Sequence, residues 1–282
     1  MMAMTYHGSM KAFLSRFVAL AMLLVPAAGQ VWAQDRQVDV ELVLAVDVSG
    51  SMRDHELALQ RRGYAEAFRT KAVHDAIAGG LIGEVAVTYV EWARVDLQRV
   101  IVPWTVIRDA QGANAFADRL EQAPVANMRN TSITGAILYG IAAIEENAFE
   151  GLRRVIDISG DGPNNQGGRV DLARDEAVDR GIVINGLPIM AEPWMGGLGF
   201  NISGLDVYYR DCVIGGPGAF LLPVRDWDEF AEAVRRKIVL ELAGKTPPDD
   251  KAVVRAMPVH LVNDGPVDCT IGERLRGIRE LR

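Results

Sequence analysis

The chain has 282 residues, with 30 Lys or Arg and 37 Asp or Glu side chains, and its formal net charge at pH 7 is −7. This acidic balance, without any basic run, argues against nucleic acid as a partner. The length suits one large domain followed by a tail.

The first 33 residues have the pattern of a secretory signal peptide. Lys11 and Arg16 supply positive charge, residues 17–28 form an apolar stretch too short to span a bilayer, and Val31-Trp32-Ala33 ends in small-x-Ala form. We expect cleavage after Ala33, which leaves 249 residues with 28 basic and 37 acidic side chains, a net charge of −9. The mature chain would then be periplasmic or secreted, with no transmembrane segment. An uncleaved membrane anchor is the alternative.

Residues 38–46 (VDVELVLAV) predict the first strand. The run alternates apolar and charged residues at first and is then continuously apolar, as is typical of a central strand in a covered parallel sheet. It leads into Asp47-Val48-Ser49-Gly50-Ser51, which places one carboxylate and two hydroxyls at the carboxyl end of the strand. Asp54 is expected to cap a helix over residues 55–77, which carry an apolar stripe at helical spacing.

Strands and helices alternate through the rest of the domain, in the following expected order. A hairpin is expected over residues 84–93 and 97–104, followed by a helix over 109–121 and by a polar loop at 127–136 that runs into a helix to about 149. Next come a strand at 154–159, a helix at 169–180, a strand at 181–189 and a loop at 190–200. The last elements are a short helical segment before Cys212, a strand at 219–224 and an amphipathic helix at 226–242. This alternation predicts an α/β fold with a doubly wound, mostly parallel sheet, one antiparallel edge strand and helices on both faces.

Beyond residue 242 we expect a linker at 245–250 and a poorly structured tail to residue 282. Cys212 and Cys269 are the only cysteines in the sequence. An even count in an exported chain indicates one disulfide, which would tie the tail to the domain, whereas two cysteines so far apart do not form a zinc site.

Polar residues from three loops are expected to meet at the carboxyl edge of this sheet, where open α/β sheets bind ligands. They are Asp47, Ser49 and Ser51 after the first strand, Thr131 in the 127–136 loop, and Asp161 after the 154–159 strand. Oxygen-only ligands favour a hard cation such as Mg²⁺. An isolated Asp-x-Ser-x-Ser is a weak signal because such runs are common in turns, but the two further loops in this order make it specific.

These stretches resemble the von Willebrand factor A (VWA) family over residues 38–242. The resemblance rests on Asp47-x-Ser49-x-Ser51, on Thr131 in TSITGA and on Asp161 in SGDG, with Gly160 standing unusually between Ser159 and Asp161. It implies the family's metal-ion-dependent adhesion site (MIDAS), with Mg²⁺ or Mn²⁺ held by Asp47, Ser49, Ser51, Thr131 and Asp161. More narrowly, the chain is similar to an uncharacterised exported bacterial branch, a domain of unknown function like DUF1194.

The resemblance implies a binding protein whose metal accepts an acidic side chain of another protein. One alternative is a metal-dependent hydrolase, for which Asp157 and His55 are the local candidates for a general base. We expect Asp157 instead to form a structural ion pair or hydrogen bond, since it stands among apolar residues. No G-x-S-x-G or Walker motif occurs. The other alternative is a structural module whose metal site is vacant.

Two neighbouring stretches have a less direct relation to the site. Residues 51–55 resemble a second metal site found beside the MIDAS of integrin β domains, but helix capping is the preferred interpretation, because His55 replaces an acidic residue there. The 190–200 loop is expected at the same sheet edge, with Trp194, Met195 and Phe200 as an apolar rim that contacts the partner. These side chains could alternatively cover the end of the sheet.

Overall fold

The computed structural model describes residues 1, 35–124, 127–191, 202–244 and 267–280. Asp35–Arg282 form one compact unit. Apart from Met1, the expected signal peptide lies outside the described residues. No helix in the described part of the chain is long and apolar enough to cross a membrane.

A five-stranded sheet with the order β3-β2-β1-β4-β5 forms the centre of the unit. All neighbouring strands are parallel except β2 and β3, which form the expected antiparallel hairpin at one edge. The predicted fold class is therefore confirmed. The strands are β1 (Arg36–Asp47), β2 (Val85–Trp92), β3 (Gln98–Ile107), β4 (Phe149–Gly160) and β5 (Ile182–Pro188).

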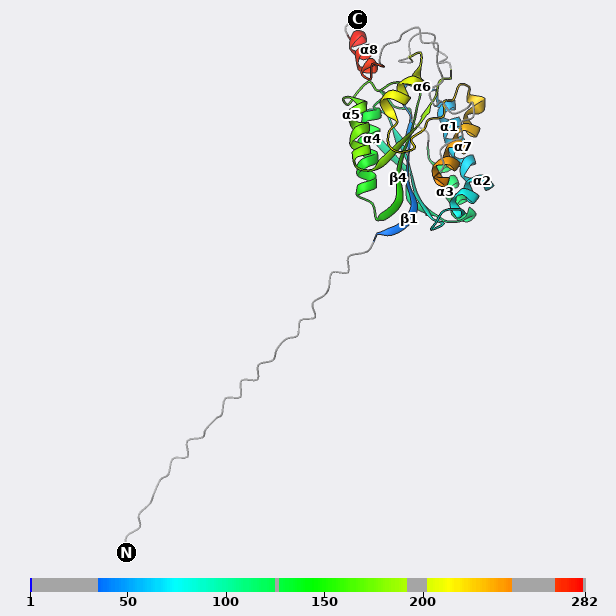
Figure 1. The fold of residues 1–282 in the computed structure, drawn as a ribbon, viewed down its shortest axis with the longest axis vertical. Helices are drawn as coiled ribbons and strands as arrows, with labels where there is room; N and C mark the ends of the chain where they lie inside the picture. Colours follow the sequence, from blue (N-terminus) through cyan, green and yellow to red (C-terminus); the bar gives the residue numbers. More distant parts are fainter. Residues whose placement is uncertain (2–34, 125–126, 192–201, 245–266, 281–282) are drawn as a thin grey trace. The chain divides into compact units, whose positions relative to one another are not determined.

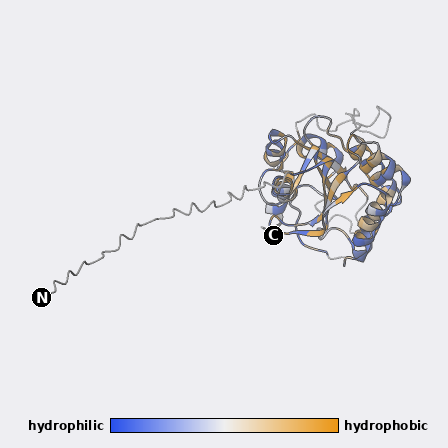
Figure 2. Ribbon diagram, turned by 90° about the horizontal axis from the view of Figure 1, so that it is seen from below, coloured by the Kyte–Doolittle hydropathy of each residue, from blue (hydrophilic) through white to orange (hydrophobic). Residues whose placement is uncertain are grey.

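Helices cover both faces of the sheet (Figure 1). Strand β1 is buried on both faces: Leu42, Leu44 and Val46 belong to one hydrophobic cluster, and Val43 and Ala45 to the other. In Figure 2 the hydrophobic colour is concentrated on the strands between the helices. The first cluster is covered by α1 (Asp54–Phe68), α2 (Lys71–Ala78), α3 (Ala110–Gln122) and α7 (Phe230–Ala243), and the second by α4 (Ile133–Glu145), α5 (Val170–Asp179), α6 (Leu205–Tyr208) and the π-helix η1 (Tyr209–Val213).

The prediction of one continuous helix over residues 55–77 is wrong, because the chain forms two helices, α1 and α2, with a break between them. Thr70 has an extended backbone conformation, and its hydroxyl accepts a hydrogen bond from the Val73 amide at 3.4 Å. A threonine that caps a new helix in this way competes with continuation of the preceding one. The start of α1 also differs: Asp54 is already helical, and the amide of Arg53 donates to the Glu56 carboxylate at 2.7 Å.

The expected strand at 219–224 forms no regular strand. It makes only isolated parallel bridges from Leu221 to Gly186 and from Val224 to Ile189. Pro223 stands between the two bridges and has no amide hydrogen to donate to a ladder. Asp226 accepts a hydrogen bond from the Asp228 amide at 3.0 Å and so caps the short 3₁₀ helix η2 (Trp227–Glu229) that leads into α7.

The tail is more ordered than the sequence indicated. Residues 271–280 form helix α8 (Ile271–Glu280), which contradicts the expectation of a tail without secondary structure. Val267, Cys269 and Ile271 pack against the hydrophobic cluster that α4 and α5 cover. Apolar contacts at the beginning of this segment therefore attach it to the domain.

Candidate metal centre

Asp47 is the last residue of β1, and its side chain is fully buried at the carboxyl edge of the sheet. Its Oδ1 accepts a hydrogen bond from the Ser49 amide at 2.7 Å, and its backbone carbonyl accepts one from Gln60 Nε2 at 2.9 Å. Its Oδ2 is buried and has no hydrogen-bond partner. Because buried carboxylate oxygens are almost always paired, this atom needs either a proton or a cation.

Three further side chains continue from Asp47 as a connected group. The Oγ atoms of Ser49 and Ser51 lie 3.2 Å apart, and the Ser51 hydroxyl donates to Asp161 Oδ1 at 2.7 Å. Asp161 directly follows β4, which is the parallel neighbour of β1. Adjacent parallel strands thus bring together residues that are 110 positions apart in the sequence.

Thr131 lies in a loop that contacts both of these segments. The loop pairs with the first segment through the Met128 amide, which donates to the Val48 carbonyl at 2.9 Å. Asn165, from the loop after Asp161, holds Thr131 on both sides: its Oδ1 accepts from the Thr131 amide at 3.1 Å, and its amide donates to the Thr131 carbonyl at 2.9 Å. Within the described residues, no hydrogen bond joins the Thr131 hydroxyl to the other four candidate ligands. The structure therefore fixes its backbone beside the site.

Gly160 and Tyr209 also lie against Asp47; the sequence marked Gly160 only as a departure from the family pattern and gave no sign of Tyr209. A Cβ atom at Gly160 would lie 2.9 Å from Asp47 Oδ2 and 2.9 Å from the Tyr209 hydroxyl. Both of these atoms are buried without a hydrogen-bond partner. Only glycine lets this part of β4 approach them, and that explains the unusual residue before Asp161. The departure from the family pattern was itself a signal of this close contact.

The two carboxyl groups strongly disfavour being ionised together. Burial raises the pKa of Asp47 well above its ordinary value, and the charge of Asp161 raises it further. Burial likewise raises the pKa of Asp161 to about 6. A bound cation would reverse this preference by stabilising both ionised carboxylates.

The donor set fits a hard cation. In the described part of the chain no group of three or more His, Cys, Asp or Glu side chains is placed to hold a metal. The candidate centre instead combines two carboxylates with hydroxyl oxygens, and oxygen donors suit Mg²⁺ or Mn²⁺ better than softer metals. The roles of Asp47, Ser49, Ser51, Thr131 and Asp161 as ligands stay a prediction, supported by the unpartnered Asp47 Oδ2.

The two candidate general bases do not take part in this site. Asp157 is buried and forms an ion pair with Lys237, with Oδ1 and Nζ 2.5 Å apart, which confirms the expected structural role. His55 is exposed in the first turn of α1. The prediction that this stretch caps α1 is confirmed, but the capping side chain is Glu56 and not Asp54.

Most of the 190–200 loop falls in the part of the chain that the structure does not describe. Trp194, Met195 and Phe200 lie outside the described residues, so their place in a partner interface stays a prediction. Met190 precedes them, and its amide donates to the Val224 carbonyl at 2.6 Å.

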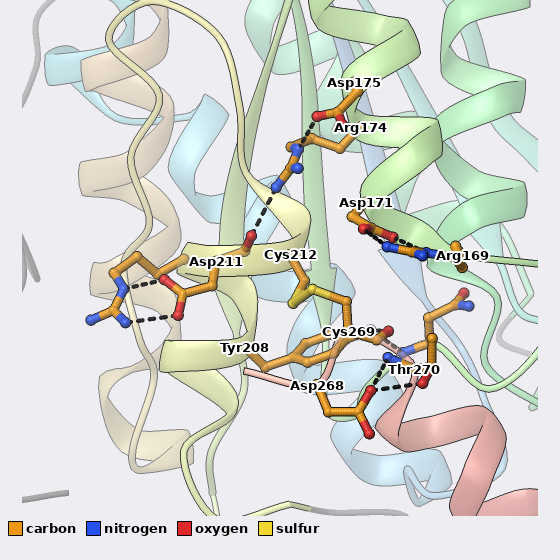
Figure 3. Close-up of a disulfide and its surroundings, with 12 residues drawn as sticks. Arg169, Asp171, Arg174, Asp175, Tyr208, Asp211, Cys212, Asp268, Cys269 and Thr270 are labelled. Carbon is orange, nitrogen blue, oxygen red and sulfur yellow. Dashed lines mark hydrogen bonds and ion pairs between the residues drawn. A yellow bond between two sulfur atoms is a disulfide. The ribbon is translucent and has the colours of Figure 1, made fainter. Parts of the chain in front are cut away.

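Cys212 and Cys269 form the predicted disulfide (Figure 3), which closes a sequence separation of 57 residues. Cys212 lies in η1, and Cys269 lies two residues before α8. The bond therefore ties the C-terminal segment to the part of the domain that carries Tyr208 and Tyr209.

Two solved structures with TM-scores of 0.50 and 0.51 share this fold. Proximal thread matrix protein 1 from the mussel byssus is 13% identical, with 75% of this chain and 49% of that chain covered, at a TM-score of 0.50. The pilus adhesin SpaC from Lactobacillus rhamnosus GG is 14% identical, with 74% and 32% covered, at 0.51. A von Willebrand factor type A structure from Catenulispora acidiphila is 17% identical, with 73% and 43% covered, at 0.49. This chain spans about half or less of each of these proteins.

Comparison at the sequence level gives the family. No curated protein matches the chain. A family model described as "Protein of unknown function (DUF1194)" matches residues 37–246, which is most of the chain and nearly all of the α/β unit. The chain therefore belongs to the DUF1194 family of proteins of unknown function.

Proposed function

We propose that this protein is exported and binds another protein through a divalent cation, Mg²⁺ or Mn²⁺, at the carboxyl edge of its sheet. The observation that carries the proposal is the buried, unpartnered Asp47 Oδ2 in a group of oxygen donors that also contains Ser49, Ser51 and Asp161. Asp47 and Asp161 would neutralise the cation, and the serines and Thr131 would supply neutral oxygens. When bound, the cation supplies a Lewis-acidic position that an acidic side chain of the partner can occupy.

Binding is favoured over hydrolysis because neither of the two candidate general bases stands ready beside the site. Asp157 is buried in an ion pair with Lys237, and His55 is exposed on α1. One protein with a similar fold is a pilus adhesin, which supports a binding role without establishing one. Export is supported by the signal-peptide pattern of residues 1–33 and by the disulfide, because disulfides persist in oxidising compartments.

Metal-dependent stability tests the site. We expect the melting temperature of the wild type to rise with Mg²⁺ or Mn²⁺, because a ligand at 100 times its Kd stabilises the native state by about 2.7 kcal/mol. Asp47→Ala and Asp161→Ala should lose this increase. Asp75→Ala is the matched control, since Asp75 is exposed on α2 and pairs with Lys71. Equal metal-induced shifts in all of these proteins would contradict the proposal.

The partner side is tested by capture from the native envelope fraction in Mg²⁺ and in EDTA. We expect capture that EDTA and Asp47→Ala both abolish. Trp194→Ala should weaken capture strongly and leave the melting temperature nearly unchanged if the 190–200 loop is part of the interface. A loss of about 3–5 kcal/mol in the free energy of unfolding would instead show that Trp194 fills a core position.

A further inference from the structure

The C-terminal segment reaches the loop that carries Asp161. The disulfide fixes Cys269 to η1, beside Tyr208 (Figure 3). The Tyr208 hydroxyl donates to the Cys269 carbonyl at 3.4 Å and accepts a hydrogen bond from the Asn164 amide at 3.2 Å. Asn164 is three residues beyond Asp161, so a short chain of contacts connects the disulfide to the candidate metal centre.

Helix α8 packs directly on the same loop. Glu273 Oε1 accepts a hydrogen bond from Asn164 Nδ2 at 2.6 Å. Gly272 is buried, and a Cβ atom there would lie 2.0 Å from the Asn164 carbonyl oxygen and 3.2 Å from the Pro163 ring. Since real Cβ atoms do not approach a backbone oxygen so closely, α8 can occupy this position only with glycine at 272.

The loop that α8 contacts forms hydrogen bonds with Thr131 and with the start of α4. Asn164 Oδ1 accepts from the Thr134 amide at 3.0 Å, at the start of α4. Asn165 makes the two hydrogen bonds that hold Thr131. A shift of Asn164 and Asn165 would therefore move Thr131, and would move Asp161 through the same short loop.

From these contacts we infer that the disulfide-tethered helix α8 is a positioning element of the metal centre, with Gly272 and Glu273 holding the loop of Asp161 in its metal-binding conformation. The inference rests on the proposed function for its effect on metal affinity. Glu273 acts through its hydrogen bond with Asn164. The disulfide keeps α8 on the loop, because it anchors the segment two residues before the helix begins.

Two glycines of α8 provide a matched pair of variants. Gly272→Ala places a methyl group against the Asn164 carbonyl, whereas a methyl group at Gly277 would have nothing within 4 Å of it. In calorimetric titrations of the full-length mature protein with Mn²⁺, Gly272→Ala should weaken affinity about tenfold or more, because losing hydrogen bonds to a charged group shifts binding by such factors. Gly277→Ala should bind like the wild type. Equal Mn²⁺ affinity in the two variants would overturn the inference.

Glu273 gives an independent pair if Gly272→Ala does not fold. Glu273→Gln retains an oxygen that can accept from Asn164 Nδ2, and it should keep most of the Mn²⁺ affinity. Glu273→Ala should lose Mn²⁺ affinity to about the same extent as Gly272→Ala. Loss of the same size in both Glu273 variants would show that the Asn164 contact does not position the site.

Hydrogen exchange on the metal-free protein separates this inference from the proposed function. Gly272→Ala should speed exchange of the backbone amides at 131–134 and 161–167 and leave those of α1 unchanged, while Gly277→Ala should alter neither. If the wild type binds no Mn²⁺, the proposed function fails, and the exchange result alone decides whether α8 holds the loop. Unchanged exchange at 131–134 and 161–167 in Gly272→Ala would overturn the inference. Free-thiol labelling checks that the disulfide is intact in each variant.

Discussion

A buried group of three charged side chains makes the stability of this domain depend on pH. Lys237 Nζ lies 2.5 Å from Asp157 Oδ1 and 2.6 Å from Glu241 Oε1, and all three side chains are almost completely buried between α7 and the sheet. With both carboxylates ionised, one lysine cannot neutralise the group. Burial and the charge of Asp157 together raise the pKa of Glu241 to about 7, against the lowering effect of Lys237.

The direction of the effect follows from proton binding. The pKa of Glu241 rises from 4.5 in the unfolded chain to about 7 in the native state, so the native state binds the proton more tightly. Its contribution to stability is fully present below about pH 4.5 and is lost as the pH rises through about 7. Since a difference of one in pKa corresponds to about 1.36 kcal/mol, the loss is roughly 3 kcal/mol across this window.

Glu241→Gln removes the titrating group and retains an oxygen for Lys237 and for Asn185, which in the wild type donates to Glu241 at 3.1 Å. Urea unfolding of both proteins at pH values from about 4.5 to about 8 should show the wild type losing roughly 3 kcal/mol relative to the variant as the pH rises. Glu232→Gln is the control on the exposed face of α7, where Glu232 pairs with Arg235. A difference between wild type and Glu241→Gln that does not change with pH would refute the reasoning.

Three further predictions concern the free energy of unfolding. Gly160→Ala should cost about 1–3 kcal/mol and weaken Mn²⁺ binding, since the new methyl group meets Asp47 Oδ2; a variant as stable as the wild type in urea would contradict the close contact. Replacing Cys212 and Cys269 by Ser should cost up to about 4 kcal/mol in the chain-entropy model for a loop of 57 residues, and the unreduced, denatured wild type should show no reactive thiol on labelling. Lys237→Met leaves two buried carboxylates without a countercharge and should cost about 3–5 kcal/mol at about pH 8 but less at about pH 5; equal losses at the two pH values would argue against that explanation.

Local patterns in the sequence were sufficient for the sheet and most of its helices. The apolar run before Asp47 predicts β1 because such a run is typical of a strand that is covered on both faces, and the 84–104 region predicts the antiparallel hairpin. Local signals also explain two errors: Thr70 begins a new helix, and Pro223 cannot donate to a strand ladder. Thr70 and Pro223 both lie inside stretches whose apolar pattern favours a continuous helix or strand, and that pattern decided the two predictions.

The sequence by itself determined which oxygen-bearing side chains follow which strands, because a strand and the loop after it are neighbours in the chain. Only the tertiary structure decided how those loops hold one another. Gly160 is needed because Asp47 and Tyr209 approach it from other elements, and Thr131 is held by Asn165. Helix α8 was not expected, since its charged sequence has little apolar surface, and its place is set by a disulfide and by contacts with Asn164. Such contacts join residues far apart in the chain, and packing of the whole domain determines them.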